Sequence, residues 1–135
     1  MSALPSPILF ETPFTEIAQR IRGFAEAQPT RIALDDGESQ LTYEQLDRWM
    51  DQTACALQRE GVQPGQAIAI CAETSVRYAA TFLGALRAGV VVAPLAPSAN
   101  AETLAAMLSD AEAKVLFIDP STAPAWLVNV PPVEI

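Results

Sequence analysis

The chain has 135 residues, of which 50% are hydrophobic and 18% are charged, and its formal net charge is −8 with no histidine. This length and composition predict one globular domain, or part of one, with a sizeable buried core. The acidic balance argues against nucleic acid as a partner, because an acidic surface repels phosphate backbones.

The first residues carry no targeting or membrane signal. Residues 1–7 lack a basic residue and a long apolar run, so they do not predict a signal peptide. No apolar run approaches the roughly 20 residues of a membrane span. We therefore expect a cytoplasmic protein with no membrane span. Three prolines, Pro5, Pro7 and Pro13, predict an extended N-terminal arm over residues 1–13.

Hydrophobic spacing predicts an α/β subdomain over residues 14–120, which begins with a helix over 14–27. Short strands at 31–35 and 41–43 are expected to form a hairpin around Asp36-Gly37. Thr42 and Gln45 have the spacing of a capping box, so a second helix starts there and ends at Gly61. Its predicted inner face consists of Leu46, Trp49, Met50, Thr53, Ala54 and Leu57.

Three apolar strands follow, at 67–72, 90–93 and 114–118. The first is continuously apolar, which predicts a central strand buried on both faces. Pro94 is expected to end the second strand. The intervening helices are expected to be capped by Thr74 or Ser75, and by Ser98 or Asn100. Their predicted inward residues are Val76, Ala79, Ala80, Leu83 and Leu86 in one helix, and Leu104, Met107 and Leu108 in the other.

This alternation of strands and helices predicts an α/β fold, with a mostly parallel sheet and helices on both faces. The last stretch, residues 121–135, is expected to be a proline-rich tail with one short apolar piece at 126–128.

Open α/β sheets bind ligands beyond the carboxyl ends of their strands, which here are residues 72–75, 94–98 and 119–120. Thr74 and Ser75 at a helix N-terminus are compatible with an anion site, although plain capping is the favoured interpretation. Glu73 is interpreted as a solvated loop carboxylate.

The other reactive or aromatic side chains are expected to be core or surface residues without a catalytic role. Cys71 is expected to be a small buried hydrophobe, and Cys55 has no histidine to activate it, so both are expected to be reduced thiols. Lys114 is interpreted as a solvated strand end, and Asp35-Asp36 as part of a surface turn. Trp49 and Phe82 are interpreted as core residues, whereas Trp126 is not assigned.

No stretch has the glycine spacing of a dinucleotide or phosphate loop, and no cysteine and histidine cluster can hold zinc. The sequence therefore predicts no catalytic, cofactor-binding or metal-binding residue within this chain.

Several stretches of the sequence, taken in chain order, resemble the N-terminal part of the acyl-adenylating (AMP-forming) superfamily. That group includes acyl-CoA synthetases, peptide-synthetase adenylation domains and firefly-type luciferases. The matching stretches are Leu41-Thr42-Tyr43-Glu44-Gln45-Leu46-Asp47, residues 56–70, residues 82–95 with Gly84-Ala85-Leu86-Arg87-Ala88-Gly89, and residues 104–119.

The resemblance implies the first subdomain of the large N-terminal domain of an ATP-dependent ligase, most like the acid–CoA ligases. In such enzymes a carboxylate attacks the α-phosphorus of ATP with the help of Mg²⁺, and the thiol of coenzyme A then takes the acyl group. The family's catalytic motifs lie downstream of the matched region. The chain alone is therefore expected to be an inactive scaffold for the downstream catalytic subdomain, and to self-associate through an exposed apolar seam.

Two alternatives remain open. The chain is compatible with part of an amino-acid-activating domain that serves a carrier protein, or with a stand-alone, non-catalytic α/β interaction module. After the proline-ended strand many family members read Asn-Pro-x, and some have an arginine at the third position that can meet coenzyme A phosphates. Here the residues are Ala96-Pro97-Ser98, which weakens the choice of coenzyme A as acceptor.

Overall fold

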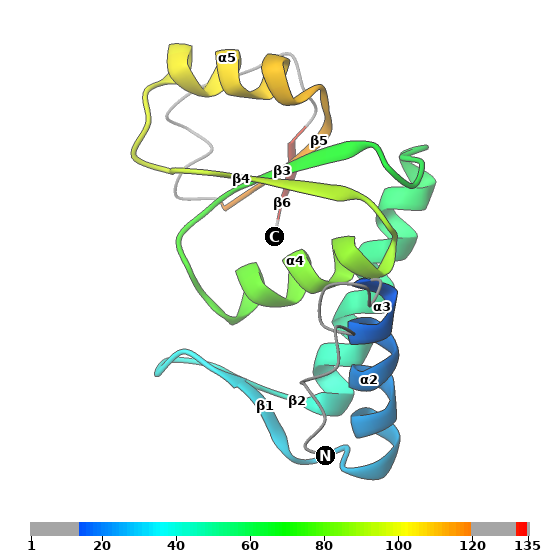
Figure 1. Ribbon diagram of the computed structural model, residues 1–135. Coiled ribbons are helices and arrows are strands. Elements are labelled where there is room, and N and C mark those ends of the chain that lie inside the picture. The colour runs from blue at the N-terminus through cyan, green and yellow to red at the C-terminus, as the bar shows by residue number, and fades with distance from the viewer. Residues whose placement is uncertain (1–13, 120–131, 135) are drawn as a thin grey trace, which may run out of the picture.

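The computed structural model describes residues 14–119 and 132–134 (Figure 1). The expected arm at 1–13 and the apolar piece at 126–128 lie outside the described residues. In chain order the elements are α2 (Phe14–Ala27), β1 (Ile32–Asp35), β2 (Gln40–Thr42), α3 (Tyr43–Arg59), β3 (Ala67–Cys71), α4 (Val76–Arg87), β4 (Val91–Leu95), α5 (Ala101–Ala111), β5 (Ala113–Ile118) and β6 (Pro132–Glu134).

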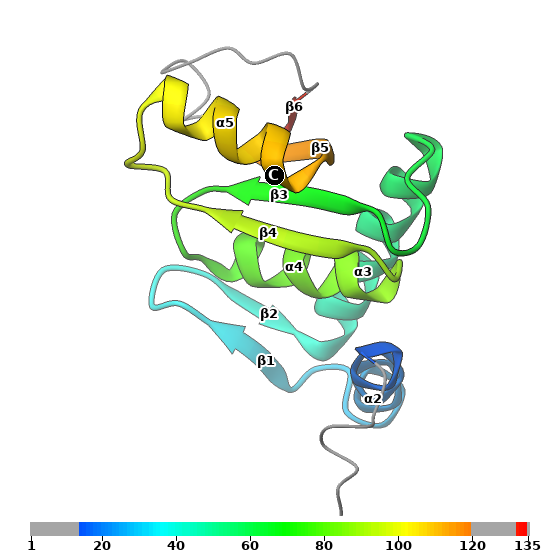
Figure 2. The same cartoon turned by 45° about the horizontal axis from the view of Figure 1, so that its top comes forward.

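A four-stranded parallel sheet in the order β4-β3-β5-β6 forms the centre of the fold. Helix α4 covers one face of this sheet and α5 covers the other (Figure 2). The predicted α/β fold with a parallel sheet and helices on both faces is therefore confirmed. Strand β6 lies in a stretch for which no strand was predicted, and it pairs with β5.

The core lies on both faces of β3, as its continuous apolar sequence predicts. Ile68, Ala69, Ile70 and Cys71 are each 0% exposed. On the α4 face the buried cluster is Leu57, Val62, Ile68, Ile70, Ala72, Ala85, Val90, Val115 and Phe117. On the α5 face it is Ala69, Cys71, Leu104, Leu108, Leu116 and Ile118.

A further layer packs against the outer side of α4. It consists of α2, α3 and the antiparallel β1–β2 hairpin (Figure 1). Its buried centre is formed by Ala18, Leu46, Met50 and Ala80. Helix α4 is therefore covered on two sides, which corrects its predicted inner face. Of the residues predicted to face inward, Val76 and Ala80 are buried, whereas Ala79, Leu83 and Leu86 are half-buried. Thr81 and Gly84, which were not predicted to face inward, are buried.

Helices α3 and α4 approach each other closely at Gly84. A Cβ atom built on this glycine would lie 2.6 Å from the Cβ atom of Thr53, well inside contact distance. Thr53 is itself buried on α3. Glycine at this position therefore allows the two helices to pack at this separation.

The predicted helix starts are confirmed. The Thr42 hydroxyl accepts a hydrogen bond from the Gln45 backbone N–H at 3.2 Å, and the Gln45 side chain accepts one from the Thr42 N–H at 2.9 Å. Ser75 and Asn100 are the caps of α4 and α5. Gly61 follows the end of α3 with φ +80°, a conformation that costs glycine little.

Two predictions about β4 and α5 are wrong. Pro94 lies within β4, the edge strand of the sheet in the described part of the chain, rather than ending it. The Val91 N–H donates to Gln66 O on the β3 side, so by alternation position 94 faces away from β3 and no ladder hydrogen bond is lost. Met107, predicted to face inward, is 41% exposed because α5 buries only Leu104 and Leu108.

Candidate functional site

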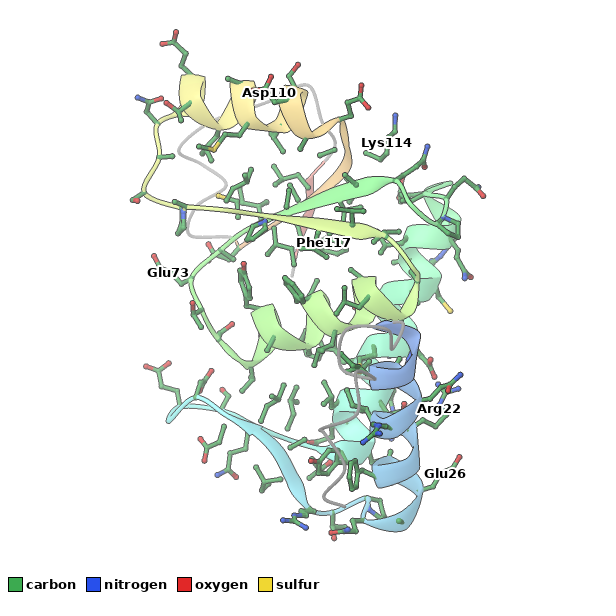
Figure 3. All side chains as sticks on the ribbon, viewed as in Figure 1. Arg22, Glu26, Glu73, Asp110, Lys114 and Phe117 are labelled. Atoms are coloured by element: carbon green, nitrogen blue, oxygen red, sulfur yellow. The ribbon has the colours of Figure 1, made fainter. Side chains whose placement is uncertain are left out.

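The carboxyl edge of the sheet brings together the ends of β3, β4 and β5 and the loops that follow them. After β3, the exposed residues Glu73 and Thr74 lead to Ser75, the N-cap of α4. The Glu73 side chain lies on the outside of this loop (Figure 3), as expected for a solvated carboxylate. Its backbone N–H donates to Asp119 Oδ2 at 3.1 Å, which joins this loop to the end of β5.

The first turn of α4 is capped from within the chain. The Ser75 hydroxyl accepts from the Tyr78 N–H at 3.1 Å, and Asp36 Oδ2 accepts from the Val76 N–H at 3.0 Å. These donors are the groups that an anion would need at a helix N-terminus. The capping interpretation of Ser75 is therefore confirmed. Thr74, the alternative cap, is exposed and does not cap the helix.

The sequence predicted Asp36 to be part of a surface turn only, but it also accepts a hydrogen bond from α4. Its Oδ1 atom accepts from the Glu38 and Ser39 N–H groups within the hairpin turn. These hydrogen bonds, led by the one from Val76, lower the pKa of the Asp36 carboxyl below its ordinary value. Sequence spacing gave no signal for the bond to Val76, because the two residues are 40 positions apart.

The two cysteines lie in different surroundings. Cys71 is buried under α5, and this burial, followed by the nearby Asp119, raises the pKa of its thiol above the ordinary value. Cys55 is exposed on α3. A buried thiol with a raised pKa is a poor nucleophile, which agrees with the predicted role of Cys71 as a small hydrophobe.

We predict that a thiol reagent such as dithionitrobenzoate reacts with Cys55 in the native chain, while Cys71 reacts only after unfolding. The release of thionitrobenzoate measured spectroscopically should therefore give one fast equivalent, followed by a second in denaturant. The Cys55→Ser variant should lack the fast phase. Rapid modification of Cys71 in this variant would contradict the burial seen here.

Trp49, Phe82 and Lys114, which the sequence predicted to have structural roles, lie in the core or at the surface and not in a site. Trp49 is half-buried, and its indole N–H donates to the Thr81 hydroxyl at 3.2 Å. Phe82 packs against the core cluster of the α4 face. Lys114 is exposed at the start of β5, at the end of the sheet opposite the loop of Glu73 (Figure 3). Trp126 lies outside the described residues.

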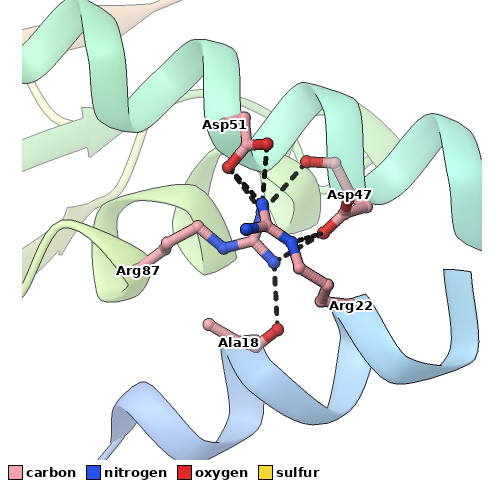
Figure 4. A network of polar contacts seen from close by, with 5 residues as sticks. All are labelled: Ala18, Arg22, Asp47, Asp51 and Arg87. Carbon is pink, nitrogen blue, oxygen red and sulfur yellow. Dashed lines mark hydrogen bonds and ion pairs between the residues drawn. The ribbon is translucent and has the colours of Figure 1, made fainter. Parts of the chain in front are cut away.

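A polar network joins the three helices α2, α3 and α4 (Figure 4). Arg87 Nη2 donates to Ala18 O at 3.0 Å and to Asp47 Oδ1 at 2.7 Å, and Nη1 donates to Asp47 O and Asp51 Oδ1, each at 3.0 Å. Arg22 binds both oxygens of Asp51, at 2.6 and 2.7 Å. Asp47, followed by Asp51, raises the pKa of Arg22 above its ordinary value.

Sequence reasoning missed this network, although Asp47 and Asp51 have the i, i+4 spacing that places two carboxylates on one helix face. A depression of about 240 Å³ beside it is lined by Ala18, Gln19, Arg22 and Arg87. Both guanidinium groups are already bound to carboxylates, so the network is suited to holding helices together rather than to binding an anion.

Across residues 14–119, no group of three or more histidine, cysteine, aspartate or glutamate side chains is placed to hold a metal ion. None of the described helices is both long and apolar enough to cross a membrane.

Comparison with known proteins gives the family of the chain. Residues 21–134 match the family of AMP-binding enzymes, so the chain belongs to that family. A curated relative, one of the subunits of linear gramicidin synthase from Brevibacillus parabrevis, is 37% identical over 108 residues, which cover 80% of this chain. A mycosubtilin synthase subunit from Bacillus subtilis is 35% identical over 94 residues, or 70% of this chain.

A solved structure with the same fold is the nonribosomal peptide synthetase FmoA3 with α-methyl-L-serine-AMP bound. Its TM-score is 0.83 at 21% identity, and the match covers 98% of this chain and 15% of that one. The chain spans 2% of the gramicidin synthase relative and 4% of the mycosubtilin synthase relative. It therefore matches a small part of much longer proteins.

Proposed function

We propose that this chain forms the first part of an adenylate-forming enzyme that activates an amino acid and passes it to the thiol of a carrier protein. The identity to the gramicidin and mycosubtilin synthases carries this proposal. The loop after β4, Ala96-Pro97-Ser98, agrees with it, because these residues offer no cation to the phosphates of coenzyme A.

The proposed role of the described residues is scaffolding. Phosphate groups are held in proteins by cations and by unpaired backbone N–H groups. The carboxyl edge carries Glu73 and Asp119, and the first-turn amides of Val76 and Tyr78 are already bonded to Asp36 and Ser75. These residues do not fit the phosphates of ATP. We propose that ATP and Mg²⁺ are held by a catalytic subdomain that continues beyond this chain and packs against it.

An acid–CoA ligase, which the sequence resemblance favoured, is the second candidate. The fold is shared with a fatty acyl-CoA synthetase of Mycobacterium tuberculosis, at a TM-score of 0.72 and 23% identity. Relatives with 36–37% identity include two linear gramicidin synthase subunits and tyrocidine synthase 3, together with the polyketide synthase PksN of Bacillus subtilis. Because the gramicidin and tyrocidine synthases predominate among them, amino-acid activation is the better-supported assignment.

Self-association of the isolated chain stays a prediction. Large hydrophobic side chains that are exposed in the described part come from several elements: Ile17 and Phe24 from α2, Ile32 from β1, Val91 from β4 and Met107 from α5.

The proposal is tested by exchange of labelled pyrophosphate into ATP. The chain alone, with Mg²⁺ and a mixture of amino acids, should give no exchange above background. A longer polypeptide that continues through the catalytic motifs should give exchange with an amino acid, and should load a carrier protein rather than coenzyme A. Exchange by the chain alone would contradict the scaffold role. Exchange with fatty or aromatic acids only, with transfer to coenzyme A, would establish the second candidate instead.

A further inference from the structure

Two carboxylates from distant parts of the chain hold the loop that follows β3. Asp119, at the end of β5, accepts from the Glu73 N–H, and Asp36, in the β1–β2 turn, accepts from the Val76 N–H. We propose that Asp36 is a positioning residue, which fixes the first turn of α4 and, with it, the loop Ala72–Ser75 at the carboxyl edge of the sheet.

Asp36 is held firmly enough to serve this role. Its Oδ1 atom accepts from the Ser39 N–H at 2.7 Å and the Glu38 N–H at 2.9 Å, while its own N–H donates to Ser39 O at 3.1 Å. The strands on either side of this turn are anchored, because Leu34 and Leu41 pack against the buried cluster that contains Met50. The hairpin is therefore an arm whose base lies on α3 and whose tip contacts the start of α4 (Figure 2).

A carboxylate is required at this position because both of its oxygens accept hydrogen bonds. An asparagine has a single acceptor oxygen. In the Asp36→Asn variant that oxygen should stay with the two turn amides of Glu38 and Ser39, so the side-chain NH₂ group would face the Val76 N–H. Two donors would then meet, and the bond to α4 would be lost.

Asp35 is a matched control, since it is the adjacent residue and carries the same charge. It accepts from the Gly37 N–H at 2.8 Å and from the Gln40 side-chain amide at 3.0 Å, both within the hairpin. In Asp35→Asn the oxygen can keep the Gly37 bond, and the Gln40 amide can turn to present its own oxygen. This variant removes the same charge but leaves the contact with α4 in place.

The role of Asp36 in setting the position of this loop does not depend on which reaction the whole protein catalyses. Its test therefore uses no activity, and it can fail while the proposed function holds. Open α/β sheets bind ligands at this edge, so a ligand that reached it would meet a loop held in place by Asp36.

The experiment is amide hydrogen exchange followed by NMR in the wild-type chain and in the Asp36→Asn and Asp35→Asn variants. In Asp36→Asn the Val76 amide should exchange more than about tenfold faster, because it loses its own acceptor in addition to the roughly fivefold loss of overall stability expected for one cap. In Asp35→Asn its rate should change less than about twofold. The Ile70 amide in β3 reports on global stability, so in Asp36→Asn it should accelerate by no more than about fivefold, which is the loss of overall stability expected for one cap, and in Asp35→Asn by less than about twofold.

The proposal is overturned if Val76 exchanges equally in all three chains, if Asp35→Asn accelerates it as much, or if Ile70 accelerates by the same factor as Val76. A second variant, Asp36→Glu, covers the case in which Asp36→Asn does not fold. It keeps the charge but displaces the oxygens by one methylene group, so it should also expose Val76. Wild-type protection in Asp36→Glu would show that charge alone suffices, and would likewise overturn the proposal.

Discussion

Replacement of Gly84 by alanine is expected to lower the free energy of unfolding by about 1–3 kcal/mol, the range found when a packed contact is overfilled. The new methyl group would lie 2.6 Å from the Thr53 Cβ atom, so α3 and α4 would have to move apart. The Cβ atom of Thr53 cannot give way by rotation of the side chain. Urea denaturation followed by circular dichroism measures the loss.

Gly23→Ala is the matched control, because Gly23 also lies within a helix, α2, but has nothing within 4 Å of a built Cβ atom. There the better helix propensity of alanine should raise stability by about 0.5–1 kcal/mol. The same chemical change should therefore have opposite signs in α2 and α4. A Gly84→Ala chain as stable as the wild type would mean that the two helices are not packed at this separation.

Removal of the Arg87 side chain is expected to cost about 2–4 kcal/mol, because the carbonyls of Ala18 and Asp47 lose this donor in a largely desolvated place. The Asp47 carboxylate would keep only its longer contact to Arg22 Nε, at 3.4 Å. The Arg87 side chain is 12% exposed and that of Asp47 is 20% exposed. Arg87→Lys should recover only part of this loss, since a single ammonium group cannot reproduce the planar guanidinium fork. Thermal and urea unfolding of both variants measure the effect.

Arg48→Ala is the control for this experiment. Arg48 pairs with Glu44 one turn away on α3, and both side chains are more than half exposed, at 62% and 58%. Its removal should cost less than about 0.5 kcal/mol. If Arg87→Ala were as mild as Arg48→Ala, the network in Figure 4 would not be what holds α2 and α3 to α4.

The local signals in the sequence were sufficient for most of the fold. Thr42 and Gln45 specify a helix start through contacts three residues apart, and the continuous apolar run of β3 specifies a strand covered on both faces. Neither depends on the rest of the chain. The parallel sheet follows from the alternation of such strands with helices.

The errors arise where a neighbour distant in sequence decides the outcome. Thr81 and Gly84 are buried because α3 packs on the side of α4 that faces away from the sheet, a contact that the spacing of large apolar residues does not reveal. Met107 is exposed because it lies on the side of α5 that faces away from the sheet, and none of the described residues covers that side. Strand β6 is short and begins with a proline, so its sequence carries little strand signal.

The polar contacts were the least predictable part of the candidate site. The bond from Val76 to Asp36 spans 40 residues, and the one from Arg87 to Ala18 spans 69. A charged side chain and a backbone group so far apart have no mutual pattern in one sequence. The chemistry that the sequence assigned to Ser75 was local capping, and this is the part that the structure confirms.

The place of Pro94 in β4 also affects how the molecule behaves toward its own copies. Amyloid-like growth proceeds by adding a strand to a free edge, where the incoming chain needs a row of amide donors. By the alternation that starts at Val91, the outward N–H groups of β4 belong to positions 92 and 94, and proline has none. A strand added to this edge would lack a hydrogen-bond donor at Pro94, so this side of the sheet is a poor template for fibril formation.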